Sequence, residues 1–160
     1  MLKDILKILE NDSRASPKQI SAVTGMTEGE VVRLIEQAEK ARLILKYKTV
    51  INWDKVEDEQ VWALISVKLT PQKDVGYDSI AERIYRYPQA RTVYLISGTS
   101  DLIVLVVSKS AREVANFVSQ KLATIEGVQE TVTQFLLKRY KEDGEIIDSR
   151  EEVKRQPVVF

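Results

Sequence analysis

One part of the N-terminal region contains the same helix-start signal twice, with a glycine between the two copies. Ser16 is followed three positions later by Gln19, and Thr27 is followed in the same way by Glu30. A hydroxyl residue with an amide or carboxylate three positions on forms a capping box, in which each side chain bonds the backbone N–H of the other residue. Gly25 can adopt the left-handed conformation that often ends a helix. The pattern predicts two short helices joined by a tight turn.

Apolar residues recur at helical spacing in three N-terminal segments, 2–10, 17–24 and 28–41. Helices this short are not stable alone in water, so we expect the three to share one apolar cluster. The residues predicted to be buried in this cluster are Leu2, Ile5, Leu6, Leu9, Ile20, Val23, Val31, Leu34, Ile35 and Ala38.

A change of pattern follows these helices. Residues 44–53 are rich in β-branched and aromatic side chains, which favours a strand that forms a small wing or leads into a hinge. The charged stretch 56–60 comes next and separates two differently patterned halves. We therefore expect a helical domain with its short strand over 1–54, a linker over 55–60, a second domain over 61–140 and a charged, solvated tail over 141–160.

The second domain is predicted to alternate strands and helices. Strands are expected over 61–69, 90–97, 101–107 and 128–138, and helices over 77–85 and from Ser110 up to Gly127. The order β-α-β-β-α-β is the split arrangement of ferredoxin-like sheets. The predicted fold class is therefore α+β, with a winged-type helix-turn-helix followed by a ferredoxin-like βαββαβ domain.

The predicted strand at 102–107 is apolar on both faces. An antiparallel sheet with helices on one side normally has a polar face on the other side. The chain has no spare element to cover a second apolar face. We therefore expect a partner subunit, and so a homo-oligomer.

Composition excludes several classes of function. Lys+Arg and Asp+Glu are both 24, so only a local patch could attract nucleic acid. Cysteine and histidine are absent, which excludes disulfides, Cys/His zinc sites and histidine-based triads. We expect no enzyme activity, no cofactor and no metal. No apolar run approaches the roughly 20 residues of a membrane span, so a cytoplasmic protein without a membrane partner is expected.

The three predicted helices have the shape of a helix-turn-helix, which places a recognition helix in the major groove of DNA. Phosphate contacts would come mainly from Lys18, Arg33, Lys40, Arg42, Lys46 and Lys48. The third helix also carries several glutamates, which predicts modest affinity unless several copies bind together. A three-helix cluster that serves only folding or docking is the alternative.

A second candidate site lies at the turn 98–101. Its glycine is expected in any hairpin. Gly98, Ser100 and Asp101 nevertheless bring backbone amides, a hydroxyl and a carboxylate to one end of the sheet, and Thr131 and Thr133 follow on the last strand. These groups could hold the ammonium and carboxylate of an amino acid. An ordinary polar strand end is the alternative.

Taken together, these segments resemble the Lrp/AsnC (feast/famine) transcription factors over essentially the whole chain to about Tyr140. The residues that carry the resemblance are Arg14 to Ser16, Met26-Thr27 with Val31, Leu43-Ile44 with Tyr47, Val93-Tyr94 to Gly98 and Asp101, and Gly127-Val128 with Thr131 and Thr133. Their joint order and spacing, rather than any one of them, make the match.

The resemblance implies a DNA-binding regulator that is a dimer built by sheet-to-sheet packing, often assembled further into octamers. It implies effector amino acids bound near the turn at Gly98 to Asp101. The DNA-binding residues that we expect are Ser16, Lys18, Thr27, Glu28, Glu30, Arg33, Lys40, Arg42 and Lys46. The family often has arginine where Leu34 stands here and glycine where Arg42 stands, so we expect a less sharp helix exit at Arg42.

Two other functions are weighed against this one. An effector-sensing oligomeric module without sequence-specific DNA reading is consistent with the acidic third helix. A haem-pathway decarboxylase subfamily resembles the same two-domain plan, but those enzymes depend on histidine, which this chain lacks.

Overall fold

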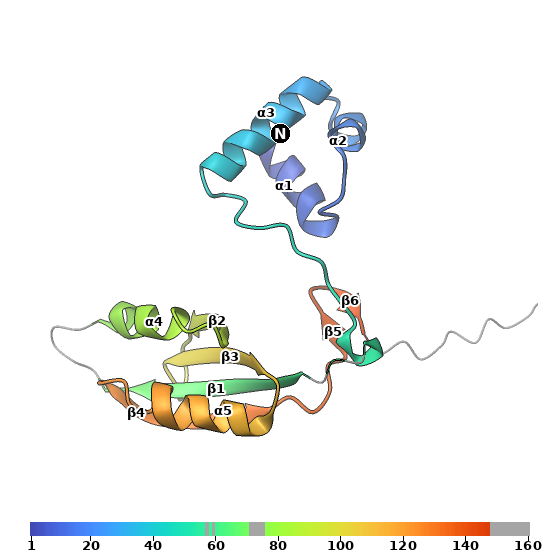
Figure 1. The fold of residues 1–160 in the computed structure, drawn as a ribbon. Coiled ribbons are helices and arrows are strands. Elements are labelled where there is room, and N and C mark those ends of the chain that lie inside the picture. Colours follow the sequence, from blue (N-terminus) through green and yellow to red (C-terminus); the bar gives the residue numbers. More distant parts are fainter. Residues whose placement is uncertain (57, 59, 71–75, 148–160) are drawn as a thin grey trace, which may run out of the picture. The chain divides into compact units, whose positions relative to one another are not determined.

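The computed structural model describes residues 1–56, 58, 60–70 and 76–147 (Figure 1). The chain divides into two compact units, Met1–Ile51 and Asn52–Phe160. The predicted linker at 55–60 lies just after this division, although Glu57 and Glu59 fall outside the described residues.

The first unit consists of three helices, α1 (Leu2–Asn11), α2 (Pro17–Thr24) and α3 (Glu28–Lys40), at the positions predicted. They enclose one apolar cluster, whose buried members are Ile5, Leu9, Ile20, Met26 and Val31. The prediction that Val23 is buried was wrong, because its side chain is 75% exposed. The helix α2 has only eight residues, and Ile20 alone provides its buried contact.

Both predicted capping boxes are present. At the start of α2, the Ser16 hydroxyl accepts from the Gln19 N–H at 3.3 Å, and Gln19 Oε1 accepts from the Ser16 N–H at 2.8 Å. At the start of α3, Thr27 and Glu30 make the same pair of bonds. Gly25 ends α2 with φ +73°, in the left-handed region that glycine adopts without strain. The two signals therefore fix the tight turn between α2 and α3.

The exit from α3 differs from the expectation of a less sharp end. Arg42 has φ +56°, so an arginine occupies the left-handed position. The Arg42 N–H donates to the Glu39 carbonyl at 3.0 Å and the Leu43 N–H donates to the Ala38 carbonyl at 2.8 Å. These two bonds form a complete Schellman motif. The helix thus ends sharply, and Arg42 bears the strain that glycine would avoid.

We expect the substitution Arg42→Gly to stabilise the first unit by roughly 0.5–1 kcal/mol, because the left-handed conformation disfavours a residue with a Cβ. Thermal unfolding followed by circular dichroism measures this change. Lys40→Gly, which introduces glycine at a helical position two residues earlier, is the control and should destabilise the unit. A lower melting temperature for Arg42→Gly would contradict the strain argument.

The predicted strand over 44–53 is not formed. Residues 46–52 have no regular secondary structure, and a short 3-10 helix (η1, Trp53–Lys55) follows. The β-branched and aromatic composition of residues 44–53 favours a strand, but a strand also needs a pairing partner. The segment has none among the described residues. The wing of the predicted helix-turn-helix is therefore not built as a strand.

The second unit contains a four-stranded antiparallel sheet in the order β2-β3-β1-β4. Its strands are β1 (Val61–Leu69), β2 (Ala90–Leu95), β3 (Leu102–Ser108) and β4 (Val128–Phe135). The helix α4 (Tyr77–Tyr85) connects β1 to β2, and α5 (Ala111–Phe117), continued by the π-helical turn η2 (Val118–Leu122), connects β3 to β4. The predicted ferredoxin-like order is confirmed, although the last strand ends at Phe135 rather than at 138.

One face of the sheet is covered by both helices. Ile65 and Val104 are fully buried on this face, in one cluster with Ile84 of α4 and Val114 of α5. The ring of Tyr87 meets the ring of Phe117 edge-on, with centroids 5.5 Å apart. The core of the second unit therefore lies between the sheet and its two helices.

The other face of the sheet carries the intervening side chains. Leu64 pairs with Leu105 across β1 and β3, and Ile103 and Val107 occupy the same face of β3. All four side chains are half-buried, while their neighbours in the strands are buried under the helices. This second face is apolar, as the sequence predicted, and we refer to it as the open face.

A small hairpin follows the sheet, with β5 (Lys141–Glu142) paired to β6 (Glu145–Ile146). Ile147 is only 6% exposed, its N–H donates to the Tyr140 carbonyl at 3.0 Å, and its own carbonyl accepts from Asn52 Nδ2 at 3.2 Å. The prediction of a charged, solvated tail did not include this hairpin or the buried Ile147, although residues 141–146 are themselves exposed or half-buried. Residues 148–160 of that predicted tail lie outside the described residues.

Candidate DNA-binding and effector sites

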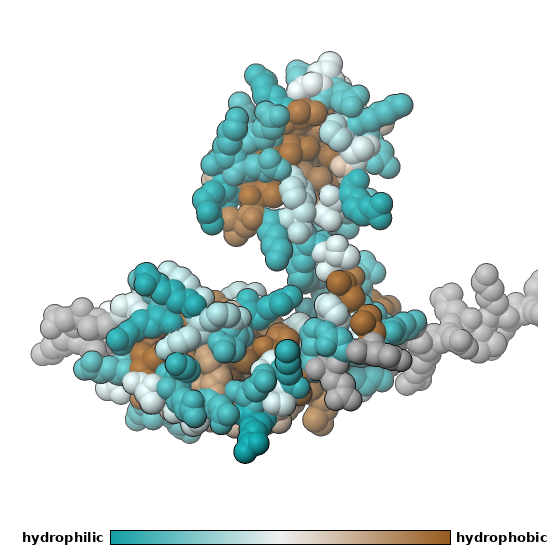
Figure 2. Space-filling model, viewed as in Figure 1, coloured by the Kyte–Doolittle hydropathy of each residue, from teal (hydrophilic) through white to brown (hydrophobic). Residues whose placement is uncertain are grey.

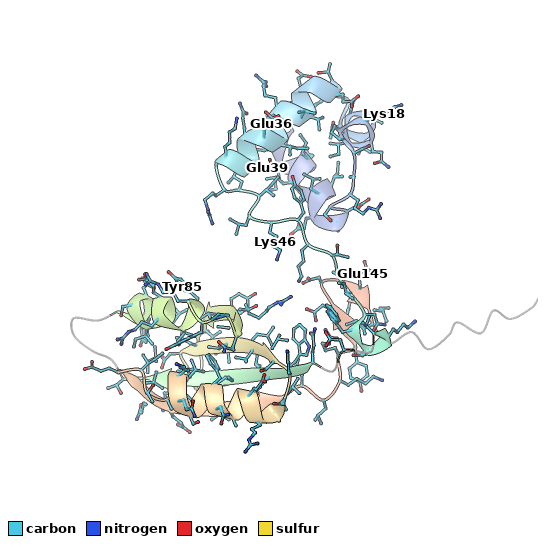
Figure 3. The ribbon with its side chains drawn as sticks, viewed as in Figure 1. Lys18, Glu36, Glu39, Lys46, Tyr85 and Glu145 are labelled. Carbon is cyan, nitrogen blue, oxygen red and sulfur yellow. The ribbon has the colours of Figure 1, made fainter. Side chains whose placement is uncertain are left out.

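The outward side of α3 is the surface on which a recognition helix would meet DNA. Val32, Arg33, Glu36 and Lys40 follow Gly29 by three, four, seven and eleven positions, and all five residues are exposed. This spacing places them on one stripe of α3, and Figure 3 labels Glu36 on this helix. Arg33 and Lys40 are among the residues predicted to contact DNA, whereas Val32, which is 38% exposed, was not predicted. An exposed valine beside an arginine supplies apolar contact for a thymine methyl group.

Three of the predicted DNA contacts are held in the capping boxes. The hydroxyls of Ser16 and Thr27 are bonded to Gln19 and Glu30, and the Glu30 carboxylate accepts from both the N–H and the hydroxyl of Thr27. Their side chains thus fix where α2 and α3 begin. At the front of α3, Glu28 and Arg33 make no hydrogen bond to the described residues, which leaves their polar atoms available to a ligand.

The predicted phosphate contacts come from different elements of the first unit. Lys18 lies on α2, Lys40 ends α3, Arg42 is in the Schellman turn and Lys46 is on the segment that follows (Figure 3). All four side chains are exposed. The structure therefore leaves each ammonium or guanidinium group accessible to a polyanion.

The segment that carries Lys46 is fixed by two side-chain bonds. The Tyr47 hydroxyl donates to the Glu39 carboxylate on α3 at 2.7 Å, and the Ser13 hydroxyl donates to the Lys48 carbonyl at 3.3 Å. Partial burial, followed by the bond to Glu39, raises the pKa of the Tyr47 phenol. The tyrosine thus stays neutral and holds the segment beside the recognition helix.

The capping box of α3 makes the first unit sensitive to acid. The hydrogen bonds from the Thr27 hydroxyl and then the Thr27 N–H lower the pKa of Glu30 below its ordinary 4.5. Because the folded-state pKa is the lower one, the stabilisation is present above the ordinary value and is lost as the pH falls through the folded pKa. We expect acid to fray α3 in the wild type, and Glu30→Gln to remove that part of the pH dependence.

An acid titration followed by far-ultraviolet circular dichroism measures this effect. Glu36→Gln is the matched control, because Glu36 is an exposed glutamate of the same helix that takes no part in a cap. Identical acid titrations for the wild type and Glu30→Gln would contradict the role of the Glu30 carboxylate.

At the predicted effector site, Asp101 is bonded to the end of β1. Its Oδ2 atom accepts from the Leu69 N–H at 2.7 Å, and its own N–H donates to the Val67 carbonyl at 3.0 Å. The pairing between β1 and β4 shifts register between Lys68 and Leu69. The Asp101 carboxylate therefore holds a strand end that the ladder alone does not fix.

The threonines of the predicted site lie across β1 from this turn. Thr131 pairs with Val67 and Thr133 with Ile65, so both threonines lie on the helix-covered face, where they are half-buried. Ser100 is half-buried as well, whereas Gly98 is exposed at the turn with φ +143°. The structure thus places Asp101 and Thr131 on either side of Val67, with Thr133 two residue pairs further along β4.

Within the described residues, neither a metal-ligand cluster nor a membrane-spanning helix is found. No group of three or more acidic side chains is arranged to hold a metal ion. None of the helices in these segments has the length and apolar character needed to cross a bilayer.

Comparison with known proteins identifies the family. Residues 62–146 match the Lrp/AsnC ligand binding domain. The chain is 43% identical over 153 residues to an uncharacterised HTH-type transcriptional regulator, YugG, of Bacillus subtilis, covering 95% of this chain and 92% of that one. It is 31% identical to the HTH-type transcriptional regulator FL11 of Pyrococcus horikoshii, over 90% of this chain and 92% of that one.

A solved structure has the same fold. The transcriptional regulator NMB0573 of Neisseria meningitidis, in complex with L-Met, superposes with a TM-score of 0.69 at 21% identity, over 88% of this chain and 90% of that one. At this identity the likeness concerns the fold alone. The family match and the sequence relatives carry the assignment, and the chain belongs to the Lrp/AsnC family of HTH-type transcriptional regulators.

Proposed function

We propose that this regulator binds operator DNA through α3 and changes its binding when an amino acid occupies the second unit. The observation that carries the proposal is the pair of capped helices, which turns the stripe with Val32 and Arg33 outward. We assign DNA binding to residues 1–54 and effector binding and oligomerisation to residues 61–140. No catalytic reaction or cofactor is part of the proposal. We place the protein in the cytoplasm, where it would bind DNA.

On DNA, the residues divide by role. Arg33, Glu28 and Val32 would meet base edges in the major groove, because they lie at the front and outer side of α3. The phosphate contacts would come from Lys18, Lys40, Arg42 and Lys46. Ser16, Thr27 and Glu30 would act mainly through the helix starts that they cap, which present backbone N–H groups to phosphates.

We place the effector at the sheet end formed by the turn and the two threonines. The carboxylate of Asp101 suits an ammonium group, and the hydroxyls of Ser100, Thr131 and Thr133 together with the Gly98 backbone suit a carboxylate. The L-Met complex of the structural relative NMB0573 supports an amino acid as the effector class.

The proposed assembly is a homodimer in which the open faces of two sheets pack together. The half-buried side chains of Leu64, Ile103, Leu105 and Val107 support this arrangement, because an isologous interface needs the same apolar patch on both copies. Octamers built from such dimers are a further assembly that the family resemblance implies.

Thermal shift with each common amino acid, followed by titration of any that stabilises the protein, tests the effector assignment. Thr131→Val removes a hydroxyl at nearly constant volume. It should lower the affinity for the effector about tenfold, since one lost hydrogen bond to a charged group is worth roughly 1.5 kcal/mol. Thr124→Val is the control, because its hydroxyl bonds only the backbone of its own helical turn. An unchanged titration for Thr131→Val would remove this residue from the site.

A further inference from the structure

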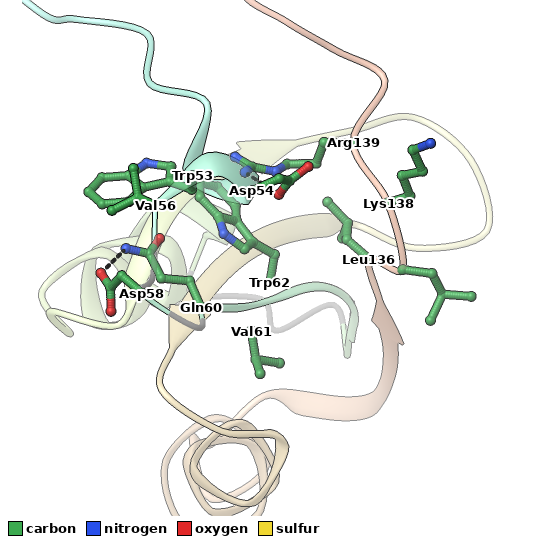
Figure 4. A pocket seen from close by; sticks show the side chains of 11 residues that line it. Trp53, Asp54, Val56, Asp58, Gln60, Val61, Trp62, Leu136, Lys138 and Arg139 are labelled. Carbon is green, nitrogen blue, oxygen red and sulfur yellow. Dashed lines mark hydrogen bonds and ion pairs between the residues drawn. The ribbon is translucent and has the colours of Figure 1, made fainter. Parts of the chain in front are cut away.

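A groove of about 490 Å³ lies at the start of the second unit (Figure 4). One of its walls, Trp62, pairs with Val107, so the groove borders the open face. Small-molecule sites usually have volumes of about 300–1,000 Å³. Its apolar walls come from Trp53, Val56, Trp62 and Leu136, and Arg139 contributes a cation. These residues come from η1, from the residues that follow it, from β1 and from the segment after β4. The groove is therefore formed within one unit.

Arg139 is the central polar group of this groove. Its side chain is only 9% exposed, and its guanidinium carbon lies 4.6 Å from the centre of the Trp62 ring. Asp54 is the one acceptor that the described residues give it, at 3.4 Å, and Asp54 itself is 57% exposed. A guanidinium has five N–H donors, and its bonds to carboxylates are normally about 2.7–2.9 Å long. Within the part of the chain that the structure describes, Arg139 is thus a largely buried cation with one distant acceptor.

A second donor in the groove wall lacks a partner as well. The Trp62 indole Nε1 is buried and has no hydrogen-bond acceptor among the described residues. Buried N–H groups are nearly always paired in folded proteins. The Trp62 indole Nε1 has almost no accessible surface, so the donors that an occupant of the groove can meet are the remaining N–H groups of Arg139.

The flat walls indicate the rest of the occupant. Trp53 and Trp62 both line the groove, and Figure 4 shows their indole rings on the same side of it as the Arg139 guanidinium. Indole faces favour flat apolar groups, with which they stack or pack edge-on. The groove thus combines a buried cation with aromatic walls.

The groove is separate from the proposed effector site. Trp62 is near the first residue of β1, whereas Asp101 bonds to Leu69 at the last residue of the same strand. The two places therefore lie at opposite ends of β1, and substitutions can address them one at a time.

We propose that this groove binds a small organic acid with a flat apolar body, whose carboxylate pairs with Arg139 and whose body packs on Trp53 and Trp62. An aromatic α-amino acid and its counterpart without the amino group share this chemistry. The inference does not depend on the proposed DNA-binding function, because it rests only on residues of the second unit.

Tryptophan fluorescence of the full chain tests the proposal, because Trp53 and Trp62 are the two tryptophans of the sequence and both line the groove. Three probes are used. 3-Phenylpropionate carries only a carboxylate, phenethylamine carries only an ammonium group, and phenylalanine carries both groups. We expect a saturable change in emission with 3-phenylpropionate and none with phenethylamine. If phenylalanine binds as well, the natural ligand can be an aromatic amino acid. If it does not bind, the ligand is an acid without the amino group.

Two variants should move the affinity for 3-phenylpropionate in opposite directions. Arg139→Gln should weaken it at least tenfold, because the cation is lost. Asp54→Asn should strengthen it several-fold, because the carboxylate that competes for Arg139 is neutralised. Arg86→Gln is the matched control, since Arg86 is an exposed arginine paired with Glu82 on α4, and it should change nothing. If Arg139→Gln fails to fold, Asp54→Asn decides alone, because a merely structural role for the ion pair predicts no gain in affinity.

Several results would overturn the proposal. They are the absence of a saturable signal with either carboxylate, equal binding of phenethylamine, and an unchanged or weaker affinity in Asp54→Asn. Emission that changes on dilution of the protein but not with any probe would show that a second copy of the chain fills the groove, and would overturn it too.

Discussion

Replacement of Leu105 by aspartate is expected to convert the proposed dimer to a folded monomer. Leu105 lies at the centre of the open face, paired with Leu64 on one side and with Thr92 on the other. In a symmetric interface the change removes two buried leucines. At about 1.5–3 kcal/mol for each side chain, the free energy of dimerisation becomes less favourable by about 3–6 kcal/mol. Burying two unpaired carboxylates adds to this cost. The dissociation constant of the dimer should rise at least about a hundredfold.

Sedimentation equilibrium over a range of concentrations measures the change, and circular dichroism establishes that the variant is folded. Gln120→Asp, which adds the same charge at an exposed position of η2, is the control and should remain a dimer. A folded Leu105→Asp variant with an unchanged dissociation constant would show that the open face is not the interface.

Arg33→Ala is expected to weaken operator binding by about 1–3 kcal/mol if Arg33 reads a base edge. The guanidinium is exposed on the outer stripe of α3, where the nearby Glu30 carboxylate attracts it. A base contact and a phosphate contact differ in their consequences. Loss of a base contact relaxes sequence preference at one position, whereas loss of a phosphate contact weakens all sequences alike and lowers the salt slope by about 1.

Titrations of the operator and of a scrambled duplex at several salt concentrations separate the two cases. Arg86→Ala, at the residue that follows α4 in the second unit, is the control for loss of a positive charge. Equal affinity of Arg33→Ala and the wild type for the operator would exclude Arg33 from the contact surface.

The helices of the first unit could be predicted because their signals are local. Each capping box is contained within four consecutive residues, and both formed as predicted. The strands β1 and β3 were predictable for a similar reason, since each is an apolar run with a turn on one side. The prediction that Val23 is buried was wrong because burial depends on how α2 packs. The spacing of apolar residues does not show how much of the helix surface is covered by α1 and α3.

One error arises where structure depends on a distant partner, and one hairpin was missed despite a local signal. Residues 44–53 have strand composition, but the described part of the first unit offers no strand to pair with. The hairpin over 141–146 had a local signal, because Asp143-Gly144 is a favoured two-residue turn and both residues have positive φ. The surrounding charges led to its prediction as solvated tail. The groove could not be predicted, because Trp53, Trp62 and Arg139 meet only in the folded unit.

Fluorescence anisotropy tests most directly whether the protein reads DNA. The labelled DNA comes from the region upstream of the protein's own gene. Unlabelled random DNA is added as competitor, and the titration is repeated with and without a mixture of the common amino acids. We expect binding that resists the competitor and shifts with one amino acid. Binding that disappears into the competitor at moderate salt would contradict this expectation, and would leave α3 as a packing helix of an assembly module.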